Sequence, residues 1–140
     1  MIVQPDADHA DLAGLVAAMP FAGLLGISLE ATAVDEVRGR MAWDETRCTA
    51  GGVLHGGALM GFADTIGAIC AFLNLPAGAS TATLGSTTNL FRAVRQGEVR
   101  GVSRPLHVGR STIVVQTDLY DDRDRRVAQT TQTQAVLPGT

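Results

Sequence analysis

The chain has 140 residues, a formal net charge of −3 and no lysine, so all 11 of its basic residues are arginines. This length suits one domain with a hydrophobic core, and we expect a single domain over residues 1–140. The acidic balance argues against a nucleic acid as the main partner, because phosphate binding needs a basic surface. Neither Cys48 nor Cys70 has metal or redox spacing, and acids stand where a secretory signal needs positive charge. We therefore expect a reduced, cytoplasmic protein.

The N-terminal residues predict a short helix followed by an apolar cover. Apolar residues recur at helical spacing between Asp8 and Met19, and Pro20 would end this helix, so that residues 1–20 form a helical segment. The next stretch is apolar and interrupted by glycines. Its larger side chains are expected to pack over the core, and they are Phe21, Leu24 and Leu25.

Residues 27–43 predict a hairpin of two strands with a turn at residues 34–36. Arg38 and Arg40 share one face of the second strand. Exposed charges of this kind are usually solvated or meet acids on the partner strand, so we expect no binding role for them.

A long apolar stretch, GGVLHGGALMGFADTIGAICAFLNL, occupies residues 51–75 and contains one charge, Asp64. A helix here would be hydrophobic on all sides and must be enclosed by protein or lipid. A membrane span is disfavoured, because a charge at its centre costs about 2.5–3.5 kcal/mol. Within a protein, the Asp64 carboxylate must be paired, hydrogen-bonded or wetted by a cleft. Such acids often mark functional sites, although a satisfied structural carboxylate is the alternative.

The glycine-rich loop before this helix is not a phosphate loop, since no Gly-Lys-Ser/Thr follows. The N–H groups of a first helical turn carry partial positive charge, so Gly56, Gly57 and Ala58 predict an oxyanion site. Asp64 lies eight residues beyond Gly56, about 12 Å along a helix. One reacting carbonyl cannot contact both within about 3 Å. Either the two features serve different purposes, or two copies of the chain share the site through antiparallel helices.

The residues three or four positions from Asp64 on its helix face are Met60, Gly61, Gly67 and Ala68, and most of them are small. This pattern favours either a helix packed tightly on a neighbour or a slot beside the acid for a thin substrate. The two alternatives are compatible at a dimer interface. The slot would be lined by Leu59, Met60 and Phe62 and by residues of the first helix, and would accept an aryl or a medium alkyl chain.

Four strands are predicted after Pro76, over residues 80–91, 97–103, 111–120 and 126–137. A hairpin, a buried helix and a four-strand meander together indicate an α+β domain, with an antiparallel sheet wrapped on one helix. Five arginines against one acid between positions 92 and 110 favour either cofactor phosphates or scattered solubilising charge. His107 is expected in a loop with Gly109, Arg110 and Ser111, which could contact phosphate or adenine, although a loop histidine is more often incidental.

The segment LHGGALMGFADT resembles the HGG motif followed by an acid in hotdog-fold acyl-CoA thioesterases, a group that includes phenylacetyl-CoA and 4-hydroxybenzoyl-CoA thioesterases. The spacing of nine from His55 to Asp64 matches. The resemblance extends from about Phe21 to Leu137 and includes TNLFRAVRQGE and the HVGRS loop. It implies a curved antiparallel sheet around one helix, dimers joined through their sheets, and often tetramers made of two dimers.

The resemblance also implies the roles of particular residues. Asp64 would be the catalytic carboxylate, as general base on water or as nucleophile. The Gly56 N–H of the other subunit would polarise the thioester carbonyl, and His55 would shape the loop. Coenzyme A is part of the substrate, and neither a cofactor nor a metal is implied. The expected substrate-binding residues are Thr49, Gly57, Thr83, Gly109, Arg110 and Ser111.

One position departs from the pattern. Six residues before the histidine, where relatives often carry Asn or Gln, this chain has Thr49. A shorter hydroxyl would do less to hold the carbonyl or water, which puts the rate and the substrate in question.

Two other functions remain open. A hotdog hydratase or dehydratase would need a histidine paired with the acid, and His55 is on the wrong side of the helix to reach Asp64 in the same chain. A non-catalytic acyl-CoA-binding module would keep the arginines and could lose the acid, which is present here.

Overall fold

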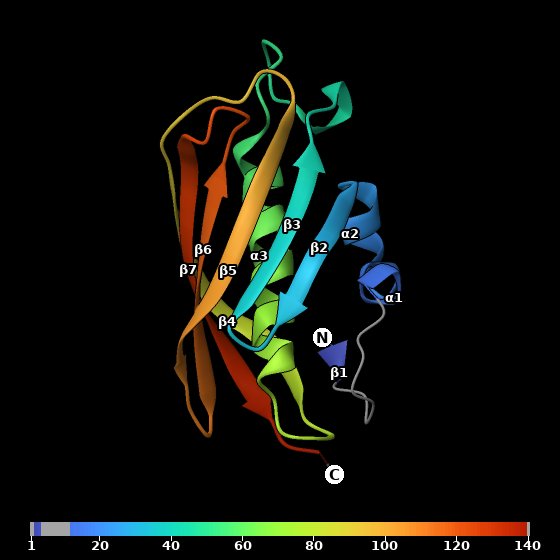
Figure 1. The fold of residues 1–140 in the computed structure, drawn as a ribbon, viewed down its shortest axis with the longest axis vertical. Helices are drawn as coiled ribbons and strands as arrows, with labels where there is room; N and C mark the ends of the chain where they lie inside the picture. Colours follow the sequence, from blue (N-terminus) through green and yellow to red (C-terminus); the bar gives the residue numbers. More distant parts are fainter. Residues whose placement is uncertain (1, 4–11, 140) are drawn as a thin grey trace.

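The computed structural model describes residues 2–3 and 12–139. One antiparallel sheet of seven strands, in the order β1-β4-β7-β6-β5-β3-β2, curves around a long central helix, α3 (Figure 1). This is the expected α+β hotdog fold. The strands are β1 (Ile2–Val3), β2 (Ile27–Ala33), β3 (Glu36–Ala42), β4 (Ser80–Leu90), β5 (Glu98–Val108), β6 (Thr112–Tyr120) and β7 (Arg126–Leu137), and the helices are α1 (Leu12–Ala17), α2 (Pro20–Leu24), α3 (Gly56–Leu73) and the 3₁₀ turn η1 (Glu45–Arg47).

The core lies between α3 and the concave face of the sheet. Phe62, Ile66 and Ile69 of α3 have no exposed surface, and β6 alternates along its length between inward and outward side chains. Among the described segments, α3 is the one helix long and apolar enough to cross a membrane. Most of it is buried inside the protein, as in the core helix of a globular domain.

The N-terminal segment differs from its prediction. The described helix α1 covers only Leu12–Ala17, and Pro20 begins the second helix, α2, at a position where a missing N–H costs nothing. Asp8 lies outside the described residues. Of the side chains expected to pack over the core, Leu25 is buried, but Phe21 and Leu24 are 58% and 74% exposed.

The predicted four-strand meander is wrong at one connection. Strands β5, β6 and β7 are neighbours in chain order, whereas β4 pairs with β7 instead of β5. The connection from β4 to β5 therefore passes β7 and β6, which lie between these two strands in the sheet. Strand β5 also runs beyond the predicted end at Ser103, so His107 lies in a strand opposite Val114 and not in a loop.

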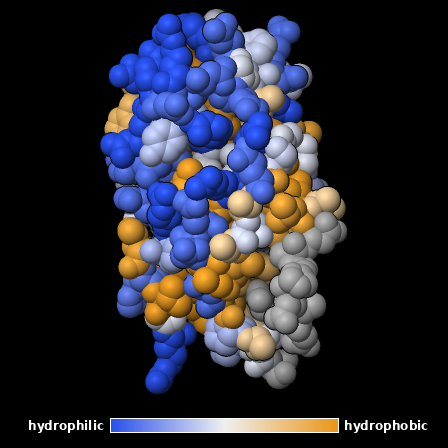
Figure 2. All heavy atoms as spheres, in the orientation of Figure 1, coloured by the Kyte–Doolittle hydropathy of each residue, from blue (hydrophilic) through white to orange (hydrophobic). Residues whose placement is uncertain are grey.

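Hydrophilic residues cover much of the face seen in Figure 2, whereas hydrophobic residues gather toward the lower part of that view. Arg40 pairs with Glu30 of β2 and Glu98 of β5, acids on neighbouring strands, whereas Arg38 pairs with Glu36 of its own strand. Exposed pairs of this kind contribute little to stability. They keep the outer face of the sheet hydrophilic.

Candidate active site

The first turn of α3 is shaped by the residue before it. His55 has extended backbone angles and caps the helix, because its Nδ1 accepts the Gly57 N–H at 2.7 Å. The His55 carbonyl oxygen accepts the N–H of Ala58 at 2.9 Å. Two of the three amides expected to bind an oxyanion are thus already used. Among the described residues, the N–H of Gly56 has no hydrogen-bond partner, and it remains available to a ligand.

Gly56 opens into a cleft of about 360 Å³ whose lining includes Thr49, Leu59 and Leu90. A Cβ built on Gly56 would lie 2.8 Å from a methyl group of Leu90, so the backbone of α3 and the end of β4 lie in close contact. The structure therefore brings together Thr49 and Gly56, two residues that the sequence predicted for the site.

Asp64 projects from the middle of α3 and is only half-buried. Its Oδ1 accepts a hydrogen bond from the Thr83 hydroxyl of β4 at 2.8 Å and another from Gln132 Nε2 of β7 at 3.1 Å. Among the described residues, Oδ2 has no partner. One oxygen of the carboxylate is therefore held in place while the other is free to accept a proton or to attack a substrate.

Two glutamines on the inner face of β7 support this arrangement and were missed by sequence reasoning. Gln132 bonds Asp64 directly, and Gln134 Nε2 donates to Thr83 Oγ1 at 2.7 Å. The alternation in the run QTTQTQ places both glutamines on the same face of a strand. This is the signal that could have identified them, because polar side chains facing a core need partners there.

The predicted acyl slot is only partly present. Phe62 is fully buried in the core and lines no open slot, Leu59 is 3% exposed and lines the cleft beside Gly56, and Met60 is 43% exposed. Gly67 packs closely against Gln132, and Gly61 faces the Phe21 ring, so part of this helix face is tightly packed.

A second cleft of about 330 Å³ runs between α2 and the start of α3. Phe21, His55 and Gly57 are among the residues that line it. The exposed aromatic ring of Phe21 thus forms one wall of a cleft beside the first turn of α3.

Gly109, Arg110 and Ser111 form the turn between β5 and β6, where the Gly109 N–H donates to the Thr112 carbonyl oxygen at 2.8 Å. This turn lies at the far end of β5 from the Gly56 cleft, since β5 begins beside the loop that reaches Leu54. Eleven strand residues span roughly 35 Å. The structure does not bring these residues near Gly56 within one chain.

The five arginines between positions 92 and 110 do not form one patch. They are distributed over both ends and the length of β5, and two of them are paired with acids. Arg100 pairs with Asp124, and Arg104 donates to Glu36 at 2.6 Å. Of the two explanations, this distribution favours solubilising charge for these two residues.

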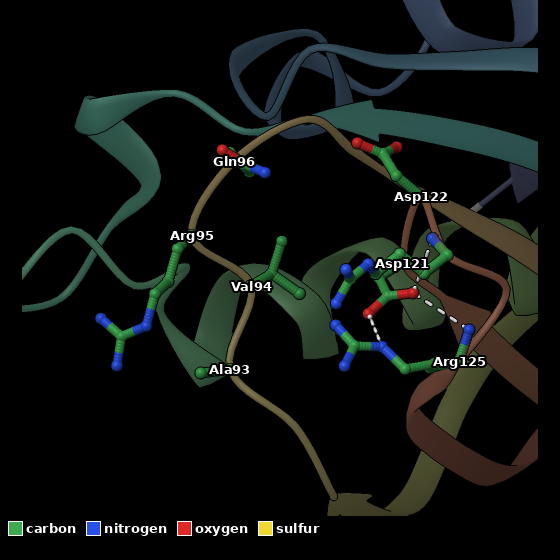
Figure 3. Close-up of a pocket in the computed structure, with 8 residues that line it drawn as sticks. Ala93, Val94, Arg95, Gln96, Asp121, Asp122 and Arg125 are labelled. Carbon is green, nitrogen blue, oxygen red and sulfur yellow. Dashed lines mark hydrogen bonds and ion pairs between the residues drawn. The ribbon is translucent and has the colours of Figure 1, made fainter.

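A cleft of about 540 Å³ lies between the loop before β5 and the loop joining β6 to β7 (Figure 3). Two acids line it, Asp121 and Asp122, and Asp121 accepts hydrogen bonds from the backbone N–H groups of Arg123 and Arg125 and from the Arg125 side chain. Burial raises the pKa of Asp121, but these donors outweigh it and lower the pKa overall. In Figure 3, Arg95 extends away from Asp121. We interpret the hydrogen bonds to Asp121 as structural contacts that hold the β6–β7 loop in shape.

The part of the chain that the structure describes contains no group of three or more His, Cys, Asp or Glu side chains able to hold a metal ion. Cys48 and Cys70 are both free thiols. Burial, with a smaller contribution from Asp35, raises the pKa of Cys70 to about 12, so this thiol stays protonated and unreactive.

Comparison with known proteins links this geometry to a family. Residues 51–128 match the family described as the thioesterase superfamily. The chain is 32% identical over 115 residues to a 1,4-dihydroxy-2-naphthoyl-CoA hydrolase of Escherichia coli (strain K12), covering 82% of this chain and 85% of that protein. It is 33% identical over 113 residues to the proofreading thioesterase EntH of Cronobacter turicensis, covering 81% and 82% of the two chains.

Solved structures agree with the sequence matches. A mutant thioesterase from Pseudomonas aeruginosa superimposes with a TM-score of 0.87 at 30% identity, covering 94% of this chain and 96% of the other. A thioesterase from Haemophilus influenzae gives a TM-score of 0.88 at 27% identity, covering 99% and 96%.

Proposed function

We propose, from the premise that this chain belongs to the thioesterase superfamily and is a thioester hydrolase, that its substrates are acyl-CoA thioesters. Products would be the free acid and coenzyme A. The observation that carries the proposal is the half-buried Asp64, whose Oδ1 is fixed by two donors while Oδ2 is unengaged. Names of relatives support the substrate class, since one is a hydrolase of an aromatic acyl-CoA.

Asp64 is proposed to act as general base on water or as the nucleophile itself. As general base, Asp64 takes a proton from water, the hydroxide adds to the thioester carbonyl, and the tetrahedral oxyanion collapses as the carbon–sulfur bond breaks and the coenzyme A thiolate takes the proton back from Asp64. As nucleophile, Asp64 adds to the carbonyl itself, the thiolate leaves and takes a proton from solvent, and water then hydrolyses the acyl anhydride to the free acid and the Asp64 carboxylate. The amide of Gly56 is proposed as the oxyanion donor, and one well-placed donor is worth about 2.7–4 kcal/mol in such a step. His55 would support it by holding the first turn in shape.

The donor and the acid must come from different copies of the chain. They are eight residues apart on a continuous helix, about 12 Å along its axis. This separation exceeds the reach of one carbonyl group. A second subunit could supply the Gly56 N–H to the Asp64 of the first, and a twofold axis would generate two equivalent sites.

The open edge of β4 supports such a dimer. In the described part of the chain, β1 pairs only with Ser80 and Thr81 on this side of β4, which leaves the backbone from Ala82 to Leu90 unpaired. Exposed edges of this length invite pairing with another strand.

The contacts of β4 also suggest a register. Thr83 contacts Asp64, while Leu90 lies beside Gly56. Antiparallel pairing of two β4 strands that sets Thr83 opposite Leu90 of a second copy would therefore bring Asp64 toward that copy's Gly56. The axis would pass midway between positions 83 and 90, near Ser86 and Thr87.

The other proposed contacts with the substrate are given as residues alone. We propose that Thr49 and Gly57 lie near the thioester, that Thr83 orients the catalytic carboxylate, and that the turn carrying Gly109, Arg110 and Ser111 contacts the nucleotide of coenzyme A. A homotetramer of two dimers and a cytoplasmic location complete the proposal. The two free thiols fit a reducing compartment.

The test measures release of the coenzyme A thiol from a panel of aryl and medium-chain acyl-CoAs. Asp64→Asn should lower kcat about a hundred- to ten-thousand-fold, the usual effect of losing a general base. Asp35→Asn, in the exposed β2–β3 turn, is the matched control and should be unaffected. Equal rates in wild type and Asp64→Asn would contradict the assignment. Binding of acyl-CoA without turnover would indicate an acyl-CoA-binding module. Addition of water to the acyl chain, or its removal from that chain, would indicate a hydratase or dehydratase.

A further inference from the structure

The inner face of β7 is unexpectedly polar where it meets α3. Gln132 and Gln134 are 1% and 0% exposed, and Thr81 on the neighbouring strand is 2% exposed. Buried amides are costly unless they are hydrogen-bonded. Each of these three side chains is connected to the hydrogen bonds around Asp64.

The directions of these bonds are fixed by chemistry. A carboxylate only accepts, so the single hydrogen of the Thr83 hydroxyl must point to Asp64 Oδ1, 2.8 Å away. Thr83 Oγ1 must then accept from its other neighbour, which is Gln134 Nε2 at 2.7 Å. An amide nitrogen can give this hydrogen, whereas an ionised carboxylate in its place could only compete for the hydrogen of Thr83.

The orientation of the Gln134 amide is set at its Thr83 end. The Thr81 hydroxyl has one hydrogen and two acceptors within reach, the Ala135 carbonyl oxygen at 2.8 Å and Gln134 Oε1 at 3.1 Å. Thr83 Oγ1, whose hydrogen goes to Asp64, needs a donor, and Nε2 therefore faces Thr83. The order Gln134, Thr83, Asp64 is a chain of donors running one way.

We propose that Gln134 is a positioning residue, which sets the direction of the Thr83 hydroxyl and so leaves Oδ2 of Asp64 as the reacting oxygen. This inference rests on the proposed role of Asp64 in hydrolysis. Gln132 adds a second donor to the same Oδ1, at 3.1 Å. With both donors on Oδ1, the lone pairs of Oδ2 are directed to water or to the thioester carbon.

The decisive comparison is between two substitutions of similar size. Gln134→Leu removes both the N–H that donates to Thr83 and the oxygen beside Thr81. It leaves Thr83 free to donate to Asp64, so kcat should fall only a few-fold. In Gln134→Glu, the protonated acid still donates to Thr83, but the ionised form draws the Thr83 hydrogen away from Asp64. The kcat of Gln134→Glu relative to wild type should therefore fall about ten- to a hundred-fold as pH rises.

Relative kcat of Gln134→Leu should instead stay constant with pH, and KM should change little in either variant, because Gln134 does not touch the substrate. The groups bonded to Gln134 are the neutral hydroxyls of Thr81 and Thr83, and Asp64 is the one carboxylate reached through them. Thr83→Val should lose the pH-dependent effect of Gln134→Glu.

A second readout needs no activity. At pH 8, Gln134→Glu should lower the midpoint of thermal unfolding, and by a smaller amount in the Asp64→Asn background, where the side-chain amide can donate to Thr83 in the reverse direction. The difference between these two shifts is the coupling between positions 134 and 64, and it should shrink when Thr83→Val is also present. Additive changes in the unfolding midpoint, or equal kcat for Gln134→Glu and Gln134→Leu at every pH, would overturn the proposal. Wild type inactive on every acyl-CoA, with the thermal coupling intact, would reject the proposed function but not the donor chain.

Discussion

The side-chain amide of Gln132 occupies the space that a Cβ at position 67 would need. An ideal Cβ on Gly67 would lie 1.9 Å from Gln132 Oε1. The same amide donates to Asp64 Oδ1 through Nε2. The glycine on α3 thus permits a strand residue 68 positions from Asp64 in the sequence to hold the proposed catalytic carboxylate.

Gly67→Ala should therefore damage the site from a distance. The added methyl group pushes Gln132 away from Asp64, so kcat should fall about ten- to a hundred-fold and overpacking should cost about 1–3 kcal/mol of stability. Gly23→Ala is the matched control, since nothing lies within 4 Å of its Cβ. A Gly67→Ala variant with wild-type kcat would show that Gln132 does not position Asp64.

The role of the Gly56 amide can be isolated with proline. Gly56→Pro removes the N–H at the first helical position, where proline is well tolerated, and the extended backbone of His55 suits a following proline. The value of kcat should fall about 10²–10³-fold. Gly56→Ala adds a similar Cβ near Leu90 but keeps the N–H, so it should retain most activity. Equal losses in the two variants would indicate steric damage instead.

Mixing two inactive variants tests whether two subunits share the site. Asp64→Asn and Gly56→Pro chains are unfolded together and refolded at equal concentrations. Half of the resulting dimers would be mixed, and each of these would contain one intact site and one doubly defective site. About a quarter of wild-type activity should return. Activity that stays at the level of the separate variants would place the donor and the acid in one chain, or show that Gly56 has no catalytic role.

His55 is expected to act through the helix cap. His55→Ala removes the acceptor of the Gly57 N–H and should lower the free energy of unfolding by about 0.5–2 kcal/mol, whereas His55→Asn restores an acceptor and should recover most of that loss. Chemical denaturation measures both. If the two variants were equally unstable, the Nδ1 contact would not be the source of the stability.

The hydrogen bonds to Asp121 predict a pH-dependent contribution to stability. Its pKa is lowered in the folded state, so the folded protein binds fewer protons and the contribution is present above the unfolded value, near 3.9. It is lost as pH falls through the folded pKa. Asp121→Asn should lower the unfolding midpoint by a few degrees at pH 7, and this difference should shrink below about pH 4. Asp35→Asn should show no such trend.

Local patterns were enough to predict the central helix and its acid. The run of apolar residues around Asp64 predicted an enclosed helix, with a charge that disfavoured a membrane span, and alternation or β-branched residues indicated the strands. The pairing of β4 with β7 could not be read, because strand neighbours are set by packing over the whole sheet. Alternation in their own segment places Gln132 and Gln134 on one face of a strand, but their partner Asp64 depends on the same sheet-wide packing.

Geometry also decided between two alternatives and overturned one expectation. The arginines from Arg92 to Arg110 left a phosphate-binding patch or scattered solubilising charge open, and the extended β5 separates them over its whole length, which favours the second. Phe21 and Leu24 looked like core residues by their hydrophobicity, yet both are largely exposed. Hydrophobicity alone does not say whether a side chain faces the interior of its own domain.

The proposed pairing of two chains along the open edge of β4 would link catalytic output to protein abundance. If each active centre is completed only when two chains meet at this edge, the number of working centres follows the square of the chain concentration below the dissociation constant. A tenfold dilution in that range would then reduce the measured rate about a hundredfold by mass action. Cells that halve the supply of this enzyme in that regime would lose far more than half of its turnover.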